Sequence, residues 1–501
     1  MNLIPTTPGP APNYWCTWNL QEALANQSNG TENIRNILSE EFLLGESGWA
    51  KNIFPQIRGD LYLLLDDGWD IPRIPDTTAA LNKQYLHENL SSFVLDESKW
   101  PSFTGTPAQR LALLNTAIQS EGWKGIGVWV AAQEASRYKF HHNWLQKKYW
   151  QQRVEWSHQA GISYWKVDWG MKCLFKFFRR MLSNLGKRVA PAILVEHAPV
   201  VGPFNQKEST GRVSPRFIKR TTGFLAFGDV VRLYDVCFDL GKATMIDRLC
   251  GTLLALQQHP NQVAHQPLLH VEDEVYLAAA SGCTMGVMRH PLRPLPVKME
   301  EVVRAVRWHR LAPPFGALQQ PITCDTKILF DSWFFPPGSF WDKSVINKTI
   351  RQGAPARLTR GLPLHSVSCT DPENENEPPF VVASQNPNGT LSIATLGRTN
   401  PERGYFTPKV NITLTIPRWD VSIGVFGEYN LLSFRHPSWD TTARVLVQDI
   451  GSDEAEDVTK EVTWKDSELQ VPGDLLHRIG TSANPEGDSS EPGIVLKIVP
   501  P

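Results

Sequence analysis

The fold expected for this chain rests on one segment, Gly161-Ile-Ser-Tyr-Trp-Lys-Val-Asp-Trp-Gly170. Its β-branched and aromatic residues, bounded by glycine at each end, are typical of a short buried strand. Lys166 and Asp168 are two residues apart, so on a strand their side chains lie on the same side. A strand this apolar has little reason to end in Lys-Val-Asp unless that end faces a cavity. A structural ion pair between Lys166 and Asp168 is the competing interpretation.

Similar segments occur along the chain on both sides of this one. Short apolar runs that predict strands lie at 14–21, 60–69, 124–133, 189–197, 229–235, 262–269 and 284–288. Helical spacing of apolar residues occurs at 31–45, 106–121, 146–160, 172–185, 242–257, 271–281 and 299–310. One of these helices begins with a capping box, Thr106-Pro-Ala-Gln109.

Strand and helix alternate eight times over about 300 residues, which predicts a parallel (β/α)8 TIM barrel of the α/β class. The main alternative is a doubly wound sheet, but its glycine-rich phosphate turn is absent. In a parallel barrel, the carboxyl ends of the strands are where the chemistry takes place. The long Pro- and Asp-rich stretch 70–105 is expected to be a loop that shapes this end.

The pattern changes after Pro313-Pro314, where short alternating runs separated by turn signals replace the strand–helix alternation. Such runs predict a C-terminal all-β sandwich domain. Residues 452–491 are acidic and rich in Pro, Gly and Ser, so we expect them to be loops. The expected organisation is an N-terminal tail at 1–13, a catalytic barrel at 14–315 and a β-sandwich domain at 316–501.

Composition restricts the class of protein and its partners. The hydrophobic content of 41% and charged content of 20% are those of a globular protein. The net charge of −1 gives no reason to expect a nucleic acid or a membrane as partner. The absence of an 18-residue apolar run predicts no transmembrane helix.

The first residues and the cysteines give an expectation for the cellular compartment. The chain begins without a basic segment followed by an apolar one, so no signal peptide is predicted. This indicates a cytoplasmic protein, or a secreted or periplasmic one whose leader has been removed. The seven cysteines are scattered without CxxC spacing, and we expect them to be reduced, with neither a zinc site nor a disulfide framework.

Carboxylates end four of the predicted barrel strands: Asp66-Asp67, Asp168, Glu196 and Asp235. Like charges gathered at one rim are unfavourable unless they are used. Hydrolysis of a glycosidic bond needs two carboxyl groups. We therefore predict Asp168 as nucleophile and Asp235 as general acid/base, while a loop-capping role is the alternative for Asp235.

Other polar residues at these strand ends are candidates for binding the substrate. Lys166 could hold a substrate hydroxyl beside Asp168, and Arg232 could reach the substrate or the other acid if the backbone bends. Asp66 and Asp67 suit sugar hydroxyls, and a divalent metal is the competing interpretation for this pair. Glu196 is the further candidate, at the end of the fifth strand.

Aromatic and histidine residues complete the candidate set. Eighteen tryptophans suit a sugar-binding protein, since pyranose rings stack on indole, although each Trp is as consistent with a core position. Trp18, Trp69 and Trp129 are expected to line the pocket. His265, His270 and the acidic run 272–274 could mimic a metal cluster, but acids at a helix N-terminus are the favoured interpretation. We therefore expect no metal and no cofactor.

Three motifs resemble the α-galactosidase clan of glycoside hydrolases, clan D, including its raffinose synthase-like branch. They are Leu63-Leu-Leu-Asp-Asp-Gly-Trp69, Trp165-Lys-Val-Asp168 and Val230-Val-Arg-Leu-Tyr-Asp235, in the clan's order along the chain. The resemblance covers about residues 14–310. It implies that the acids at 66 and 67 bind galactose O4 and O6, that Asp168 is the nucleophile and that Asp235 is the acid/base.

Two positions depart from the clan's pattern. Val195-Glu-His197 stands where the clan usually has Cys, Ser or another short polar group near the sugar's C2 substituent, and Trp169-Gly170 follows Asp168 in place of polar residues. The predicted function is a retaining α-glycosidase that acts on terminal α-galactosides or a stereochemically related sugar. The alternatives are a non-catalytic carbohydrate-binding barrel, a galactosyl transferase of the raffinose-synthase type and a metal-dependent hydrolase.

Overall fold

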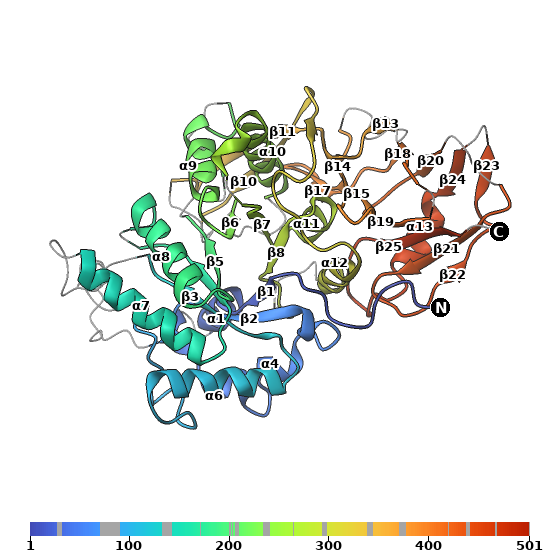
Figure 1. Cartoon of the computed structure of the whole chain (residues 1–501). Coiled ribbons are helices and arrows are strands. Elements are labelled where there is room, and N and C mark those ends of the chain that lie inside the picture. The colour runs from blue at the N-terminus through green and yellow to red at the C-terminus, as the bar shows by residue number, and fades with distance from the viewer. Residues whose placement is uncertain are drawn as a thin grey trace.

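The computed structural model places a barrel of strands and helices beside a domain made mostly of β-strands (Figure 1). The structure describes residues 1–27, 33–70, 91–132, 143–170, 172–199, 202, 204–205, 210–233, 241–263, 265–292, 298–337, 344–369, 377–418, 420–436, 441–465 and 468–499. Among these residues, no helix has both the length and the apolar character needed to cross a bilayer.

Eight parallel strands close into a barrel in the order of the sequence, which confirms the predicted fold class. They are β1 (Asn13–Cys16), β2 (Leu61–Leu65), β3 (Gly125–Val130), β4 (Tyr164–Val167), β5 (Leu194–His197), β6 (Val230–Arg232), β7 (Leu268–Glu272) and β8 (Thr284–Val287). Pairing of β1 with β8, Tyr14 opposite Gly286, closes the barrel.

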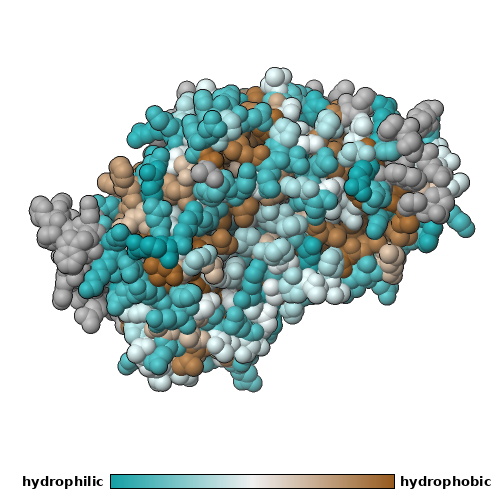
Figure 2. Space-filling view, viewed as in Figure 1, coloured by the Kyte–Doolittle hydropathy of each residue, from teal (hydrophilic) through white to brown (hydrophobic). Residues whose placement is uncertain are grey.

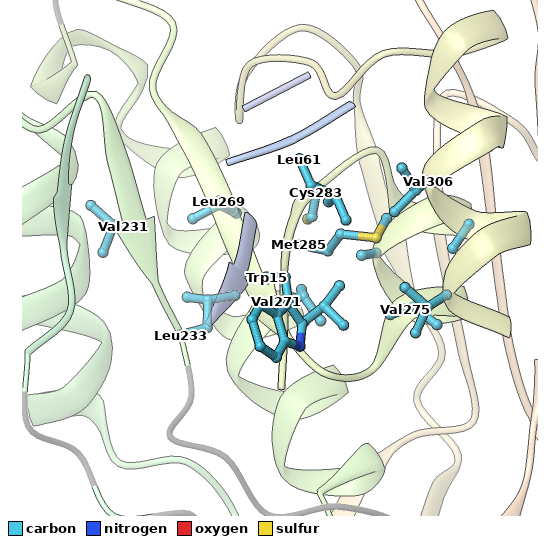
Figure 3. Packing of buried hydrophobic residues seen from close by; sticks show 14 of the residues in the cluster. Trp15, Leu61, Val231, Leu233, Leu269, Val271, Val275, Cys283, Met285 and Val306 are labelled. Carbon is cyan, nitrogen blue, oxygen red and sulfur yellow. The ribbon is translucent and has the colours of Figure 1, made fainter. Parts of the chain in front are cut away.

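Alternation along the strands separates the two faces of the barrel wall. Tyr14, Cys16, Tyr62, Leu64 and Tyr164 form a cluster inside the barrel. Their outward neighbours, such as Trp15, pack against the helices in the main core. Figure 3 shows this outer packing around Trp15, where Leu269, Val271 and Met285 of β7 and β8 meet Val275 and Val306 of the helices.

The helices around the barrel in the described part of the chain are α1 (Trp18–Gln27), α2 (Ile34–Ile37), α3 (Glu40–Leu44), α4 (Trp49–Asn52), α6 (Pro107–Ser120), α7 (Asn143–Gln159), α8 (Lys176–Val189), α9 (Pro215–Leu225), α10 (Lys242–Gln258), α11 (Val275–Ser281) and α12 (Met299–Leu311). The capping box of α6 is present as predicted, with reciprocal Thr106 and Gln109 hydrogen bonds. Helix α9 was not predicted, although Ser214 caps its N-terminus and Pro215 follows.

Two sheets of the C-terminal domain share one apolar core, as expected for a sandwich. In spatial order, the larger sheet contains β22 (Glu456–Asp457), β21 (Arg444–Asp449), β25 (Gly493–Val499), β19 (Ser422–Phe426), β15 (Leu391–Leu396), β14 (Phe380–Gln385), β12 (Arg357–Arg360) and β9 (Ile322–Cys324). The smaller contains β13 (Leu364–Cys369), β18 (Val410–Thr415), β20 (Leu431–Arg435), β24 (Glu468–Pro472) and β23 (Thr463–Lys465).

Shorter elements complete this part of the chain. They are the hairpins β10 (Ile328–Phe335) with β11 (Lys348–Pro355) and β16 (Arg398–Asn400) with β17 (Gly404–Phe406), and the helix α13 (Gly473–Gly480). The prediction that 452–491 is loop-like was wrong, because β22, β23, β24 and α13 lie within it. The apolar side chains Leu469, Val471, Leu475 and Leu476 of this stretch contribute to the sandwich core.

Buried polar and apolar contacts join the barrel to the C-terminal domain. Arg304 of α12 donates to both carboxylate oxygens of Asp449 on β21, at 2.8 and 2.9 Å, and neither side chain is exposed. Phe426 of β19 packs against Trp308 and Tyr276. The main apolar core therefore continues from the barrel helices into the larger sheet.

A disulfide between Cys250 of α10 and Cys324 of β9 also joins the two parts. The expectation that all cysteines are reduced was therefore wrong for this pair. The two positions are 74 residues apart in sequence, so no local spacing could indicate the pairing.

Candidate active site

Charged side chains fill the inside of the barrel near the carboxyl ends of four adjacent strands. Lys166 of β4, Glu196 of β5, Arg232 of β6 and Glu272 of β7 are all buried, with exposed fractions of 2% or less. Burial of this many charges is stable only if they are paired. The pairs that they form define the candidate active site.

Asp168, the predicted nucleophile, directly follows β4 and receives two side-chain hydrogen bonds. Arg232 donates to Oδ1 at 2.9 Å, and Trp129 donates its indole N–H to Oδ2 at 3.3 Å. Backbone bonds to Val130 and from Arg179 fix the main chain of Asp168. Its side chain is 13% exposed, more than those of its partners in the barrel. Both oxygens are thus held in place while part of the carboxylate stays accessible.

Arg232 therefore contacts a carboxylate, which is one of the two possibilities considered for it from the sequence. Its guanidinium also donates to Glu272, at 3.1 and 3.3 Å. With an exposed fraction of 2%, Arg232 has little surface left for a substrate. Arg232 is therefore better placed to orient the Asp168 carboxylate than to contact a sugar directly.

Lys166 does not pair with Asp168, although the two lie in one motif. Its ammonium group lies 3.1 Å from Asp66 Oδ2 and 3.5 Å from Glu272 Oε1. Burial by itself would lower the pKa of Lys166, but Asp66, Cys16 and Glu272 hold this pKa well above its usual value. Lys166 is therefore a fixed positive charge beside Asp66.

Glu272 lies between the two cations and connects them. It contacts Lys166 on one side and Arg232 on the other, and Tyr14 donates to it at 3.4 Å. One chain of contacts consequently runs from Asp66 through Lys166, Glu272 and Arg232 to Asp168. We call these five residues the barrel-end network.

Asp66 and Asp67 directly follow β2, and their carboxylates have different partners. Asp66 faces the barrel, where it accepts from Lys166 and from the thiol of Cys16 at 3.0 Å. Asp67 binds Arg35, whose Nε lies 2.7 Å from Oδ2. Burial raises the pKa of Asp67, although Arg35 opposes the effect.

Glu196, predicted to bind substrate, lies in the barrel interior and has no exposed surface. Tyr164 donates to its Oε2, and His270 Nδ1 lies 3.5 Å from the same atom. Burial raises the pKa of Glu196 to about 7, and it lowers that of His270 well below its usual value. The side chain therefore lies among interior residues of the barrel, and its predicted role in substrate binding stays a prediction.

The three predicted pocket tryptophans have different positions. Trp129 is nearly buried and donates to Asp168. Trp18 begins α1, because β1 ends at Cys16 and does not extend to 21 as predicted, and it packs beside the interior cluster. Trp69 has no exposed surface, and its N–H donates to the carbonyl of Trp129 at 2.9 Å. Trp69 is thus a core residue, which corrects its predicted place in the pocket.

Two further points concern the predicted chemistry. Asp235, the predicted acid/base, lies outside the described residues, so its distance from Asp168 stays a prediction. Within the described ranges, no group of three or more His, Cys, Asp or Glu side chains is arranged to hold a metal ion.

The contributors to the site that were not identified from the sequence include Glu272, Cys16 and Arg35. The predicted seventh strand ended at 269, whereas β7 extends to Glu272. The alternation Leu268-Leu-His-Val-Glu272 contained the signal, because it places His270 and Glu272 on one face. Arg35 had no such signal, since its contact with Asp67 depends on how α2 packs.

Comparison with known proteins gives matches among solved structures only. No family model matches the sequence, and no curated protein matches it. The fold is similar to a GH27 β-L-arabinopyranosidase from Geobacillus stearothermophilus, with 10% identity over 99% of this chain and 97% of that chain and a TM-score of 0.42.

Two α-galactosidases are also similar in fold. α-Galactosidase I from Mortierella vinacea is 13% identical over 97% of this chain and 96% of that chain, with a TM-score of 0.39. The α-galactosidase from Saccharomyces cerevisiae, solved with raffinose, is 10% identical over 98% and 95%, with a TM-score of 0.35.

Proposed function

We propose that this protein is a glycoside hydrolase, a retaining α-glycosidase that removes terminal α-galactosyl groups or a stereochemically related sugar. One observation carries the proposal. A partly exposed carboxylate, Asp168, lies at the carboxyl end of a barrel strand, and donors from two other strands hold both of its oxygens. A carboxylate oriented in this way suits attack on a carbon that lies above the barrel.

In the proposed reaction, an Asp168 oxygen forms a bond to the anomeric carbon while the bond from that carbon to the leaving oxygen breaks. Asp235 donates a proton to the leaving oxygen. Asp235 then takes a proton from water, whose oxygen attacks the anomeric carbon and releases Asp168. Each of these two displacements inverts the configuration at the anomeric carbon, so together they retain it.

Trp129 and the other residues of the barrel-end network support this chemistry by position. Arg232 and Trp129 keep the Asp168 carboxylate from rotating, so less freedom is lost when the bond to the sugar forms. Asp66, with Lys166 beside it, offers acceptor and donor atoms for sugar hydroxyls. Retention also requires the carboxyl groups of Asp168 and Asp235 to be about 5–5.5 Å apart.

The test compares the wild type with Asp168→Asn on aryl glycosides, including the α-galactoside, the α-N-acetylgalactosaminide and the β-L-arabinopyranoside. We expect Asp168→Asn to lower kcat by at least about 10³-fold, because the amide is not a nucleophile. Asp420→Asn, at an exposed position in the C-terminal domain, is the matched control and should keep wild-type rates.

A mechanism-based label separates the nucleophile from a structural role. A 2-deoxy-2-fluoro glycosyl fluoride should add one glycosyl mass to the peptide that contains Asp168 in the wild type, and none in Asp168→Asn. Unchanged turnover in Asp168→Asn, or a label on another carboxylate, would refute the assignment. Calorimetric binding of sugar without turnover by the wild type would indicate a binding barrel, and galactosyl products with an added acceptor sugar would indicate a transferase.

A further inference from the structure

Exposed apolar and cationic side chains lie together at the start of α8 and α9. The apolar ones are Leu174, Phe175 and Phe177, and the cationic ones are Lys176, Arg180, Arg216 and Lys219, with the half-buried Arg220 beside them. We call these eight residues the α8–α9 rim.

The apolar part of the rim is unusual for this protein. Leu174 is 44% exposed, Phe175 55% and Phe177 85%. The other large apolar side chains with high exposure among the described residues are scattered singly: Met1, Leu113, Leu292 and Phe334. Single exposed apolar residues are ordinary, whereas several together on one short segment indicate a surface that becomes covered.

The cationic residues of the rim have no acidic residue on their own helices. Helices α8 and α9 contain no acidic residue. In the part of the chain that the structure describes, none of the five rim cations forms a salt bridge, and Arg180 lies instead over the ring of Phe227 at 5.4 Å. Their positive potential is therefore directed to solvent.

Contacts between the two helices make the rim one surface. Lys176 extends across to α9, with Nζ 3.6 Å from the position that a Cβ on Gly223 would take. Arg220 lies close enough to Cys173 to influence the pKa of its thiol, which burial raises and Arg179 and Arg220 oppose. Figure 2 shows hydrophilic (teal) and hydrophobic (tan) areas beside each other over this part of the molecule.

The rim also lies beside the barrel mouth. Its apolar residues belong to the segment that leads from Asp168 into α8, so they are at the same end of the barrel as the candidate active site. The rim cations of α9 occupy its first two turns, and the helices of a parallel barrel begin at this end.

We propose that the α8–α9 rim is a docking surface for a lipid bilayer that contains anionic lipids. Phe175 and Phe177 would enter the boundary between headgroups and acyl chains, while the cations would lie at the lipid phosphates. A soluble polyanion would bind the cations but would leave the two Phe rings in water, so the combination favours a bilayer. The barrel mouth would then lie close to the membrane surface.

This inference revises the expectation of no membrane partner, which came from the net charge of −1. That value averages over the whole chain and therefore conceals a cationic surface that acidic residues elsewhere balance. Only the packing of α8 against α9 brings the rim cations together.

The test measures binding of the full chain to sedimenting vesicles of phosphatidylcholine, with or without 30 mol% phosphatidylserine. At about 0.1 M salt, we expect partitioning at least about tenfold stronger with phosphatidylserine. Each cation near such a surface contributes about fivefold. Arg216→Glu with Lys219→Glu should therefore reduce binding by at least about 25-fold, and Phe177→Ser should reduce it about tenfold.

Matched controls change the same residue types far from the rim. Phe334→Ser, at a 50% exposed position on β10, and the pair Lys460→Glu with Lys465→Glu on the C-terminal domain should bind like the wild type. Asp168→Asn should also bind like the wild type, because docking does not depend on the proposed reaction.

Several results would overturn the proposal. These are no preference of the wild type for phosphatidylserine vesicles, an equal loss in Phe177→Ser and Phe334→Ser, or binding that Phe177→Ser leaves unchanged. Displacement of the protein from vesicles by stoichiometric heparin with no effect of Phe177→Ser would instead indicate a polyanion site.

Discussion

Two buried cations organise the carboxylates at the end of the barrel. Lys166 lies between Asp66 and Glu272, and Arg232 lies between Glu272 and Asp168. Removing one partner from a buried pair leaves the other charge without compensation, which costs more than the pair contributes. Glu272 is the partner that both cations share, so its loss affects both ends of the barrel-end network.

Glu272→Gln tests this shared role. We expect the free energy of unfolding to fall by about 3 kcal/mol, the lower end of the range for breaking a buried pair, because each cation keeps one carboxylate. Urea denaturation measures the change. Glu461→Gln, which weakens an exposed pair with Arg478, should change the free energy by less than about 0.5 kcal/mol. Equal effects of the two substitutions would contradict the role of Glu272.

Glu196 gives the protein a pH-dependent stability. Its pKa rises from 4.5 to about 7 in the folded protein because burial disfavours the charged form. A raised carboxyl pKa contributes stability that is complete below pH 4.5 and is lost as the pH rises through about 7. The penalty at pH 8 amounts to about 3 kcal/mol relative to an uncharged group.

Glu196→Gln should remove this penalty. We expect the difference in unfolding free energy, wild type minus variant, to fall by about 3 kcal/mol between pH 4.5 and pH 8. Denaturation curves at four pH values in this range would show it. A difference that stays constant with pH would mean that Glu196 ionises normally.

At the scale of elements, local sequence signals predicted the existence of helices and strands better than their boundaries. The barrel strands were found as short apolar runs, and the capping box located the start of α6 to the residue. The end of β7 was missed because the acidic residues 272–274 suggested a helix start, whereas Glu272 continues the strand alternation. Charge alone did not distinguish a strand end from a helix cap.

Thr106→Ala tests whether the capping box stabilises the start of α6, as its geometry indicates. Loss of the side-chain acceptor for the Gln109 N–H should cost about 1 kcal/mol. Amide exchange in the first turn of α6 should therefore be about fivefold faster. Ser120→Ala at the other end of the same helix is the control and should leave exchange in the first turn unchanged.

At the scale of the whole molecule, the disulfide, the Arg304–Asp449 pair and a shared apolar core hold the C-terminal domain against the barrel. The disulfide closes a long loop, which restricts the unfolded chain. It is the contact that a change of redox conditions should remove.

Cys324→Ser should lower the free energy of unfolding by about 2–4 kcal/mol without reductant. Reductant should then destabilise the wild type but not the variant. Alkylation of the denatured, unreduced protein should leave Cys250 and Cys324 unlabelled. Cys369→Ser, which removes a half-buried thiol outside the disulfide, is the control. Alkylation of all seven cysteines would contradict the pairing.

The sequence by itself determined the alternation of strands and helices that forms the barrel, the sandwich and most residues at the strand ends. Local periodicity specifies which side chains share a face, and the parallel barrel then brings the ends of its strands to one rim. Asp66, Lys166, Asp168 and Arg232 were identified in this way.

Only the tertiary structure decided which of these residues touch. Lys166 pairs with Asp66 and Glu272 and not with its neighbour Asp168, and Glu196 lies inside the barrel. The disulfide and the α8–α9 rim likewise join residues from separate elements. Pairing depends on the distance between side chains of different strands and helices, which the packing of the whole chain sets and no local pattern contains.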